Sequence, residues 1–312
     1  MQIPLFSDIK NDPGLRRNIL RLIAFLLLFF LVDFITSLFL LKGIERFYGI
    51  KSDADILMLG HSHLMLAVDK ELLEEISGLE AAKYTREGVN MADRRVMAEH
   101  YFSTCASKPA TVILSIDPWL FSGEGLSLNS HTLFYPFMDT PAMGEYIRRS
   151  VTSPFEYDRV KLVRSSRYNA LLLNASLRGW LNNWDNLKFG VVDTSRYINK
   201  EALKNFRPIT FNRELMDDFS STLDFLAGND AHVILLNTPV WQPVVMAQQT
   251  RYDRTMHIID SLAHIHCQSA VIIDLVPGFS GRTELFFDPI HMNPEGQKVV
   301  TEYLGKILRQ GQ

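Results

Sequence analysis

One apolar stretch limits what this chain can fold into more than any other feature of its sequence. From Leu22 to Leu41 the chain holds twenty residues, mostly Leu, Phe, Ile, Val and Ala; the polar interruptions are Asp33, Thr36 and Ser37. As a helix rising about 1.5 Å per residue, this stretch matches the roughly 30 Å hydrocarbon core of a bilayer. A buried core helix of this composition would need an aqueous domain that covers all its faces. We therefore predict an uncleaved membrane anchor in contact with lipid through residues 22–41.

The anchor divides the chain into segments of very different character. We predict a short cytoplasmic tail over residues 1–18, a transmembrane helix over 19–42, a linker over 43–54 and one large domain over 55–312. Basic residues flank the span on both sides, so the positive-inside bias is slight. The short basic tail still favours a cytoplasmic start. This orientation predicts a single-pass protein of the inner (cytoplasmic) membrane, with its large domain in the periplasm or at the cell surface.

Asp33 is the unusual residue within the span. A carboxylate in mid-bilayer is costly unless it is protonated, paired, or turned toward protein or water. One interpretation is an acid that a single-pass helix tolerates by protonation or snorkelling. The other is a contact with a second membrane protein, and we favour this membrane-partner contact.

Composition excludes some classes of function. A net charge of −3 does not suggest a nucleic-acid-binding protein. Two cysteines, Cys105 and Cys267, are too few for a disulfide framework and lack metal-ligand spacing, so we expect buried free thiols rather than a bridge.

Short apolar runs alternate with helical patterns after the span. We predict strands over Ile56–Leu59, Ala81–Thr85, Thr111–Ile116, His232–Leu236 and Ala270–Leu275, and a closing amphipathic helix over Pro294–Leu308. Strands separated by helices indicate an α/β fold, a three-layer doubly wound parallel sheet.

The chain between the third and fourth strands is longer than one crossover needs. This insertion, at about 119–212, is rich in aromatic residues, Asn, Ser and Arg. Because it leaves from the carboxyl end of the third strand, we expect it to fold over that edge as a lid or substrate platform. A purely structural insertion with its own small core is the alternative.

A serine follows the first predicted strand directly. The apolar run Ile56–Leu59 stops at Gly60, and His61, Ser62 and His63 come next. In open α/β folds, ligands bind at the carboxyl edge of the sheet, so Ser62 lies where chemistry is expected.

Near the carboxyl end, Asp288 and His291 stand three residues apart, just before the last helix. A histidine there can reach a serine at the same sheet edge, and the aspartate can hold the other ring nitrogen. Serine is a poor nucleophile without such a base. The pattern therefore predicts the nucleophile, base and orienting carboxylate of a serine hydrolase.

These two motifs resemble the first and last blocks of the SGNH (GDSL-like) hydrolase superfamily. The stretch G-H-S-H covers Gly60 to His63, and D-P-I-H, Asp288 to His291, continues as H-x-N-x-x-G to Gly296. The resemblance implies a flavodoxin-like SGNH fold and esterase or acyl-transfer chemistry on acylated sugars, lipids or envelope polymers. It makes Ser62 the nucleophile, His291 the general base and Asp288 its orienting carboxylate.

The middle blocks of the family differ here. The family's second block supplies a glycine amide to the oxyanion hole, and Gly88 or Asn90 could donate in that region. Its third block supplies an asparagine from Gly-x-Asn, whereas this chain has Asp117 after the third strand. This variation, with the amino-terminal span, resembles the membrane-anchored branch linked to polysaccharide acylation and D-alanyl transfer.

We therefore expect a membrane-anchored serine esterase or O-acyltransferase acting on an envelope polysaccharide or other acylated carbohydrate. A multi-pass membrane acyltransferase is an expected partner. The alternative is a non-catalytic SGNH-like protein that binds glycan or serves as a scaffold for such an acyltransferase. A metal site built from His61, His63, Asp288 and His291 is conceivable, but histidines one residue apart on a turn need not converge. We predict no metal and no other cofactor.

Overall fold

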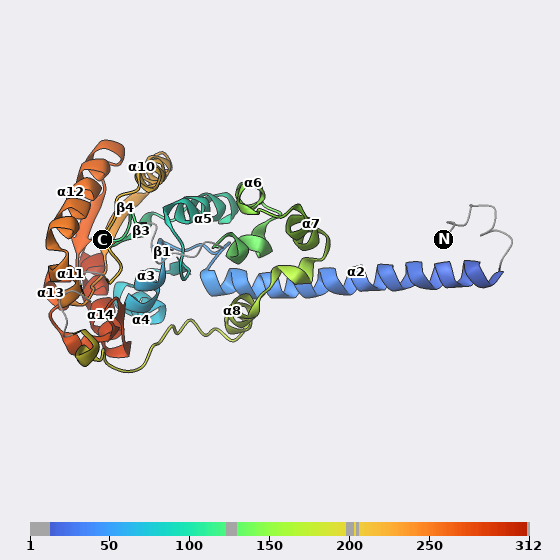
Figure 1. Ribbon diagram of the computed structural model, residues 1–312, viewed down its shortest axis with the longest axis horizontal. Helices are drawn as coiled ribbons and strands as arrows, with labels where there is room; N and C mark the ends of the chain where they lie inside the picture. Colours follow the sequence, from blue (N-terminus) through green and yellow to red (C-terminus); the bar gives the residue numbers. More distant parts are fainter. Residues whose placement is uncertain (1–12, 123–129, 198–202, 204–205, 311–312) are drawn as a thin grey trace.

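The computed structural model describes residues 13–122, 130–197, 203 and 206–310. A long helix, α2 (Pro13–Tyr48), projects from one end of an α/β domain (Figure 1). The first half of the domain contains β1 (Ile56–Gly60), α3 (Ser62–Ala67), α4 (Lys70–Ser77), β2 (Ala81–Thr85), α5 (Met91–Thr104), β3 (Thr111–Ile116), η1 (Ser130–Phe137), α6 (Pro141–Ser150), α7 (Pro154–Leu162), η2 (Arg164–Arg167) and α8 (Ala170–Trp180). The second half contains η3 (Thr194–Tyr197), α10 (Arg213–Ala227), β4 (His232–Asn237), α11 (Gln242–Ala247), α12 (Gln249–His266), β5 (Val271–Asp274), α13 (Val276–Phe279), η4 (Thr283–Leu285), β6 (Phe286–Asp288), β7 (His291–Met292) and α14 (Pro294–Gln310).

Five parallel strands of the described chain form the main sheet, in the order β2-β1-β3-β4-β5. The predicted α/β class, with a doubly wound parallel sheet, is confirmed. The strand order reverses direction at β1, so the carboxyl ends of β1 and β3 flank the switch point where such sheets bind ligands.

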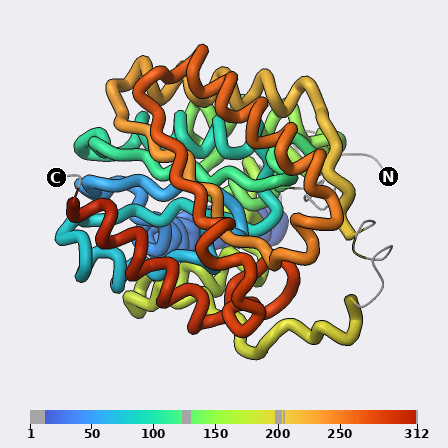
Figure 2. Tube along the Cα trace, turned by 90° about the vertical axis from the view of Figure 1, so that its left-hand side faces the viewer, coloured from blue at the N-terminus to red at the C-terminus, as the bar shows by residue number. Residues whose placement is uncertain are grey.

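Helices cover both faces of the sheet (Figures 1 and 2). Leu57 and Leu59 of β1 belong to a core shared with α5, α10 and the end of α2, whereas Ile56 and Met58 belong to a core shared with α3, α4 and α14. Successive strand residues point to opposite faces, so β1 is buried on both. Cys105 and Cys267 are free cysteines; Cys267 is buried, whereas Cys105, which was also expected to be buried, is partly exposed.

The two ends of α2 have different surroundings. Most of its leucine and phenylalanine side chains from Leu20 to Phe39 are exposed, and the helix is long and apolar enough to cross a membrane. Its last turns are buried, with Ile44, Phe47 and Tyr48 inside the domain core. The first part of the predicted linker 43–54 is therefore helical, because α2 runs to Tyr48 and these apolar side chains pack into the core. Residues 1–12 of the predicted tail lie outside the described residues.

The insertion packs along α2 rather than lying solely over the sheet edge. A Cβ on Gly43 would overlap Ser176 of α8, and one on Gly179 would overlap the Gly43 backbone, so small residues let the two helices touch. The Trp180 ring stacks on Phe39 at 4.8 Å between centroids, and its Nε1 donates to the Phe39 carbonyl at 3.1 Å. The insertion and α2 thus form one packed unit.

Asp33 is buried beneath this insertion. Its carboxylate accepts hydrogen bonds from the backbone amides of Arg164 (2.7 Å) and Ser165 (2.8 Å) at the start of η2. These amides lack helical partners, so a carboxylate satisfies them well. The acid in the span has donors within its own chain, and its contact with a second protein stays a prediction.

Candidate active site

Ser62 is the first residue of α3, immediately after β1. The chain turns tightly here because Gly60 has no side chain: a Cβ there would overlap the Ser115 side chain of β3. His61 caps the helix, and its ring Nδ1 accepts a hydrogen bond from the His63 amide at 3.2 Å. Strand end and helix start together place the serine at the switch point of the sheet.

Asp288 and His291 lie on a small antiparallel pair, β6 and β7. One oxygen of Asp288 accepts the backbone amides of Ile290 and His291, both at 2.9 Å. Its other oxygen lies 2.8 Å from Nδ1 of the His291 ring. The turn therefore fixes the carboxylate and the imidazole in one geometry.

The structure brings Ser62, His291 and Asp288 together. The Ser62 Oγ lies 2.9 Å from His291 Nε2. Because Asp288 accepts a hydrogen bond from Nδ1–H, the unprotonated Nε2 can accept the serine proton. Burial opposes ionisation of Asp288, but hydrogen bonds from the His291 ring and the two amides outweigh it and hold its pKa below the ordinary value.

The H-x-N-x-x-G motif anchors this hairpin to the last helix. Asn293 Oδ1 accepts the Gly296 amide at 3.0 Å, which caps α14. Its Nδ2 donates to the carbonyls of Gly190 (3.0 Å) and Glu284 (2.8 Å). A Cβ on Gly296 would overlap the Leu285 carbonyl, so this position requires glycine.

Gly88 and Asn90, the two predicted oxyanion donors, line one pocket with Ser62 and His291; its volume is about 190 Å³. Gly88 has a φ of +71°, a conformation that favours glycine. Asn90 caps α5: its Oδ1 accepts the Asp93 amide at 2.9 Å, while the Asp93 carboxylate accepts the Asn90 amide. This capping box leaves the Asn90 NH₂ group as its side-chain donor.

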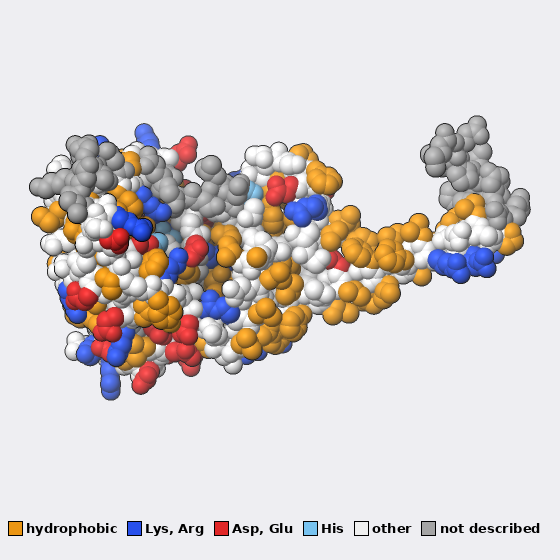
Figure 3. All heavy atoms as spheres, turned by 60° about the horizontal axis from the view of Figure 1, so that its bottom comes forward, with side chains coloured by type: hydrophobic (Ala, Val, Ile, Leu, Met, Phe, Trp, Pro, Cys, Tyr) orange, Lys and Arg blue, Asp and Glu red, His pale blue; other side chains and the backbone are white. Residues whose placement is uncertain are grey.

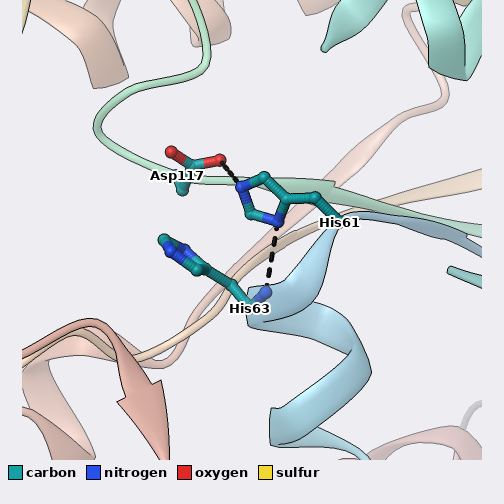
Figure 4. Close-up of side chains that lie close together, drawn as sticks. All are labelled: His61, His63 and Asp117. Carbon is teal, nitrogen blue, oxygen red and sulfur yellow. Dashed lines mark hydrogen bonds and ion pairs between the residues drawn. The ribbon is translucent and has the colours of Figure 1, made fainter. Parts of the chain in front are cut away.

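His61 and Asp117 form a second histidine–aspartate pair (Figure 4), which the sequence did not predict. A carboxylate oxygen of Asp117, at the end of β3, lies 2.9 Å from His61 Nε2. Its other oxygen accepts the Trp119 amide at 2.8 Å. The Arg94 guanidinium lies 3.9 Å from the oxygen that contacts His61. Asp117 therefore holds His61. His61 and Asp117 stand 56 positions apart, and no local pattern links them.

Burial governs the charges in this second pair. It would raise the pKa of Asp117, but His61 and Arg94 outweigh it and hold that pKa well below its usual value. Burial lowers the pKa of His61, and Asp117 offsets part of the effect. For His63, burial and the neighbouring His61 lower the pKa strongly. Near neutral pH both histidines are therefore uncharged beside an ionised aspartate.

His63 lies between the two pairs. Its ring centroid is 4.3 Å from that of His61 and 5.5 Å from that of His291. The side chain is buried, lines the pocket of Ser62, and has an Nδ1 atom without a hydrogen-bond partner in the described structure. A neutral imidazole with an unused nitrogen is a candidate hydrogen-bond donor to a substrate.

One potential metal-binding group exists among the described residues. Ligand atoms of His61, His63 and Asp117 lie within 4.8 Å of one another (Figure 4). This set differs from the one conceivable from sequence, because His291 contacts Ser62 and Asp288 contacts His291. The guanidinium of Arg94 near Asp117 disfavours a cation.

Comparisons with known proteins give distant structural likenesses. No protein-family model matches the chain, and no curated protein matches it. Similar solved structures include a protein described as lipolytic and of the G-D-S-L family from Desulfitobacterium hafniense, with a TM-score of 0.41, 10% identity, and coverage of 81% of this chain and 98% of that one. A lipase from a goat rumen metagenome has a TM-score of 0.40 and 11% identity, covering 81% and 96%.

A GDSL-like lipase from Bacteroides thetaiotaomicron is also similar, with a TM-score of 0.39, 9% identity, and coverage of 82% of this chain and 88% of that one. The structural neighbours thus include lipolytic hydrolases of the GDSL type. Because the likeness is distant, we base the function on the side-chain geometry of this chain.

Proposed function

We propose that this protein is a serine-dependent ester hydrolase or O-acyltransferase, held at a membrane by α2. The observation that carries the proposal is the continuous hydrogen-bonded chain from Ser62 through His291 to Asp288. A serine with an aligned, oriented base is the arrangement that nucleophilic acyl transfer requires. The small pocket beside it suits a short acyl group.

The geometry supports a two-step reaction. Ser62 Oγ attacks the ester carbonyl carbon while His291 Nε2 takes the hydroxyl proton. The bond to the alcohol then breaks, and His291 returns the proton to the departing alcohol oxygen. Water or an acceptor hydroxyl next attacks the acyl-serine while His291 takes its proton. The bond between the acyl carbon and Ser62 Oγ then breaks, and His291 returns the proton to Oγ. Water makes the protein an esterase and a sugar hydroxyl makes it a transferase.

The transition state carries negative charge on the former carbonyl oxygen. Candidate donors to that oxygen are the amides of Ser62 and Gly88 and, in place of the family's asparagine, the neutral ring of His63. Ionised Asp117 cannot donate, and its contact with His61 keeps it engaged elsewhere. Preorganised donors of this kind stabilise the oxyanion without reorganisation during the reaction.

A second candidate is a non-catalytic protein that binds glycan or serves as a scaffold for a membrane acyltransferase. The observation that favours it is Asp117, because the usual asparagine donor is replaced by a buried carboxylate. Both candidates predict the same membrane attachment, so the reactivity of Ser62 separates them.

Covalent labelling tests the reactivity of Ser62 directly. The full-length protein in detergent is treated with a fluorophosphonate probe, next to Ser62→Ala and a matched variant, Ser280→Ala, whose buried serine lies outside the pocket. We expect labelling of the native protein and of Ser280→Ala but not of Ser62→Ala. A native protein that stays unlabelled while folded would favour the scaffold.

We place the natural substrate among acylated envelope glycans and propose a multi-pass membrane acyltransferase as partner, in line with the motif resemblance. Asp33 tests the partner. The Arg164 and Ser165 amides donate to different oxygens of Asp33, so Asp33→Asn keeps an acceptor for one of them and Asp33→Leu removes both. If a partner contacts the charge, both variants weaken co-purification. If the acid serves only the η2 turn, Asp33→Asn leaves association unchanged.

A further inference from the structure

A second, larger pocket adjoins the catalytic one. Its volume is about 530 Å³, and it lies between the end of α2, the loop after β2, and α8. Its lining includes Tyr48, Met65, Arg86, Leu171, Asn174 and Arg178. Glu87 and Gly88 line both pockets, so the two are contiguous. The catalytic mechanism does not use this larger space.

Arg86 is a buried cation in this pocket. Arg86 is 3% exposed, and one of its guanidinium nitrogens, Nη1, has no hydrogen-bond partner in the described structure. The guanidinium lies over the ring of Tyr48, 4.9 Å from the centroid, and 5.8 Å from that of Phe134. A buried donor without an acceptor is costly, and an anion that accepts from it removes that cost.

Arg178 adds a second positive charge. It lies over the ring of Phe47 at 4.7 Å, and its hydrogen bonds go to uncharged oxygens of Asn183, Asn186 and the Asp185 backbone. Planar guanidinium groups are suited to binding phosphate through paired N–H donors. Glu87 at the shared rim is exposed, so solvent and salt screen its charge.

One side of the pocket is apolar and close to the span. Leu171 lines it and is 62% exposed. Leu171 lies one turn after Tyr168, whose hydroxyl donates to the Ser37 carbonyl of α2 at 2.9 Å. Figure 3 shows that the hydrophobic surface of α2 continues onto the adjoining domain. Leu177 and Leu181, near the end of α8, are also exposed.

We propose that this pocket binds a membrane amphiphile through an anionic phosphate headgroup. Arg86 and Arg178 bind the phosphate, and the apolar tail lies along Leu171 toward the bilayer. If the proposed function holds, the substrate is a phosphate-bearing lipid carrier. Its reactive group passes Glu87 and Gly88 to reach Ser62.

Binding of defined lipids tests the pocket. The full-length protein in maltoside detergent is titrated with dihexanoyl phosphatidic acid, dihexanoyl glycerol and inorganic phosphate, and the heat of binding is measured. We expect saturable binding of the phosphatidic acid and weaker binding of the other two. Arg86→Gln should reduce affinity about tenfold or more, the effect of losing a charge-assisted hydrogen bond. Arg149→Gln, a change at an exposed arginine, is the matched control.

Two further variants keep the test decisive if Arg86→Gln does not fold. Leu171→Glu places a negative charge at the exposed side of the pocket and should weaken phosphatidic acid binding. Leu162→Glu, equally exposed on α7 and outside the pocket lining, should not. Equal affinity for inorganic phosphate and phosphatidic acid would overturn the proposal that the ligand is an amphiphile. If neither Arg86→Gln nor Leu171→Glu changes the affinity for phosphatidic acid, the lipid does not bind in this pocket.

The outcome is independent of Ser62 reactivity. A chain that reacts with fluorophosphonate but binds no phosphatidic acid would overturn this inference and leave the proposed function standing. A chain that binds phosphatidic acid at Arg86 but never reacts at Ser62 would overturn the proposed function and leave the lipid site standing.

Discussion

The two histidine–aspartate pairs lie on either side of His63, yet their surroundings differ. The side chains of His291 and Asp288 are 14% and 33% exposed, and the histidine contacts Ser62. Those of His61 and Asp117 are 9% and 1% exposed, and the histidine contacts the backbone of its own turn. The same two residue types therefore support different proton chemistry in each pair.

The difference teaches that proton transfer depends on the atom facing the second ring nitrogen. In the first pair that atom is a serine hydroxyl that can lose a proton. In the second it is an amide N–H, which fixes Nδ1 of His61 as an acceptor and leaves Nε2–H toward Asp117. The second pair is suited to holding the turn around Ser62, and the first to moving protons.

The largest expected effect comes from breaking the link between Ser62 and His291. Ser62→Ala or His291→Ala should each lower turnover of a small ester by about 10³-fold or more, and the double variant little further, because a triad acts as a unit. Steady-state kinetics on the purified chain measures this. Multiplicative losses in the double variant would show that the two side chains act separately.

The same substitution in both pairs gives the sharpest comparison. Asp288→Asn should lower kcat by about 10²- to 10³-fold, because an amide no longer favours the Nδ1–H tautomer of His291. Asp117→Asn should lower kcat by about tenfold or less. Equal losses would mean that the buried pair also takes part in proton transfer.

His63 offers a smaller effect on the transition state. If its ring donates to the oxyanion, His63→Ala should lower kcat by about 10²-fold with little change in KM. His63→Gln, which retains a donor, should recover part of that loss. A His63→Ala variant with native kcat would remove the ring from the oxyanion hole.

Removing the buried charge should affect stability more than activity. Asp117→Asn leaves Arg94 without its nearby carboxylate and should lower the free energy of unfolding by roughly 3 kcal/mol. The pKa of Asp117 is depressed in the fold, so its contribution is present above about pH 3.8 and is lost as pH falls below that value. Urea unfolding in detergent at several pH values measures both effects.

The smallest effect concerns the neutral histidines. The unfolded chain binds protons near pH 6.5, whereas buried His61 and His63 resist protonation. Stability should therefore be greatest above pH 6.5 and decline as pH falls below it. His63→Gln should make that decline shallower between pH 6.5 and 5, and an unchanged slope would show that His63 titrates normally.

Local patterns predicted the elements that present the site. The apolar run before Gly60 indicated β1, and the amphipathic pattern from Pro294 indicated the closing helix α14. The strands differ by small shifts: β1 extends to Gly60, β4 to Asn237, and β5 covers Val271–Asp274. Hydrophobic period and turn chemistry are local, so one sequence suffices for them.

Long-range contacts could not be predicted in this way. The His61–Asp117 contact and the packing of Gly43 against Gly179 join distant segments whose residues show no unusual pattern of their own. Asp33 was expected to contact a second membrane protein, and the sequence could not show that amides of Arg164 and Ser165 in its own chain donate to its carboxylate. The periodicity of a helix reveals its apolar face but not what covers it.

The continuation of α2 into the domain core has a geometric consequence. Because Ile44, Phe47 and Tyr48 are core residues, no flexible tether separates the helix from the sheet. With α2 across a bilayer, Ser62 would lie at one fixed height above the lipid surface. Such a protein selects substrates by how far their ester stands from the membrane surface, and a change in bilayer thickness would alter which esters it can reach.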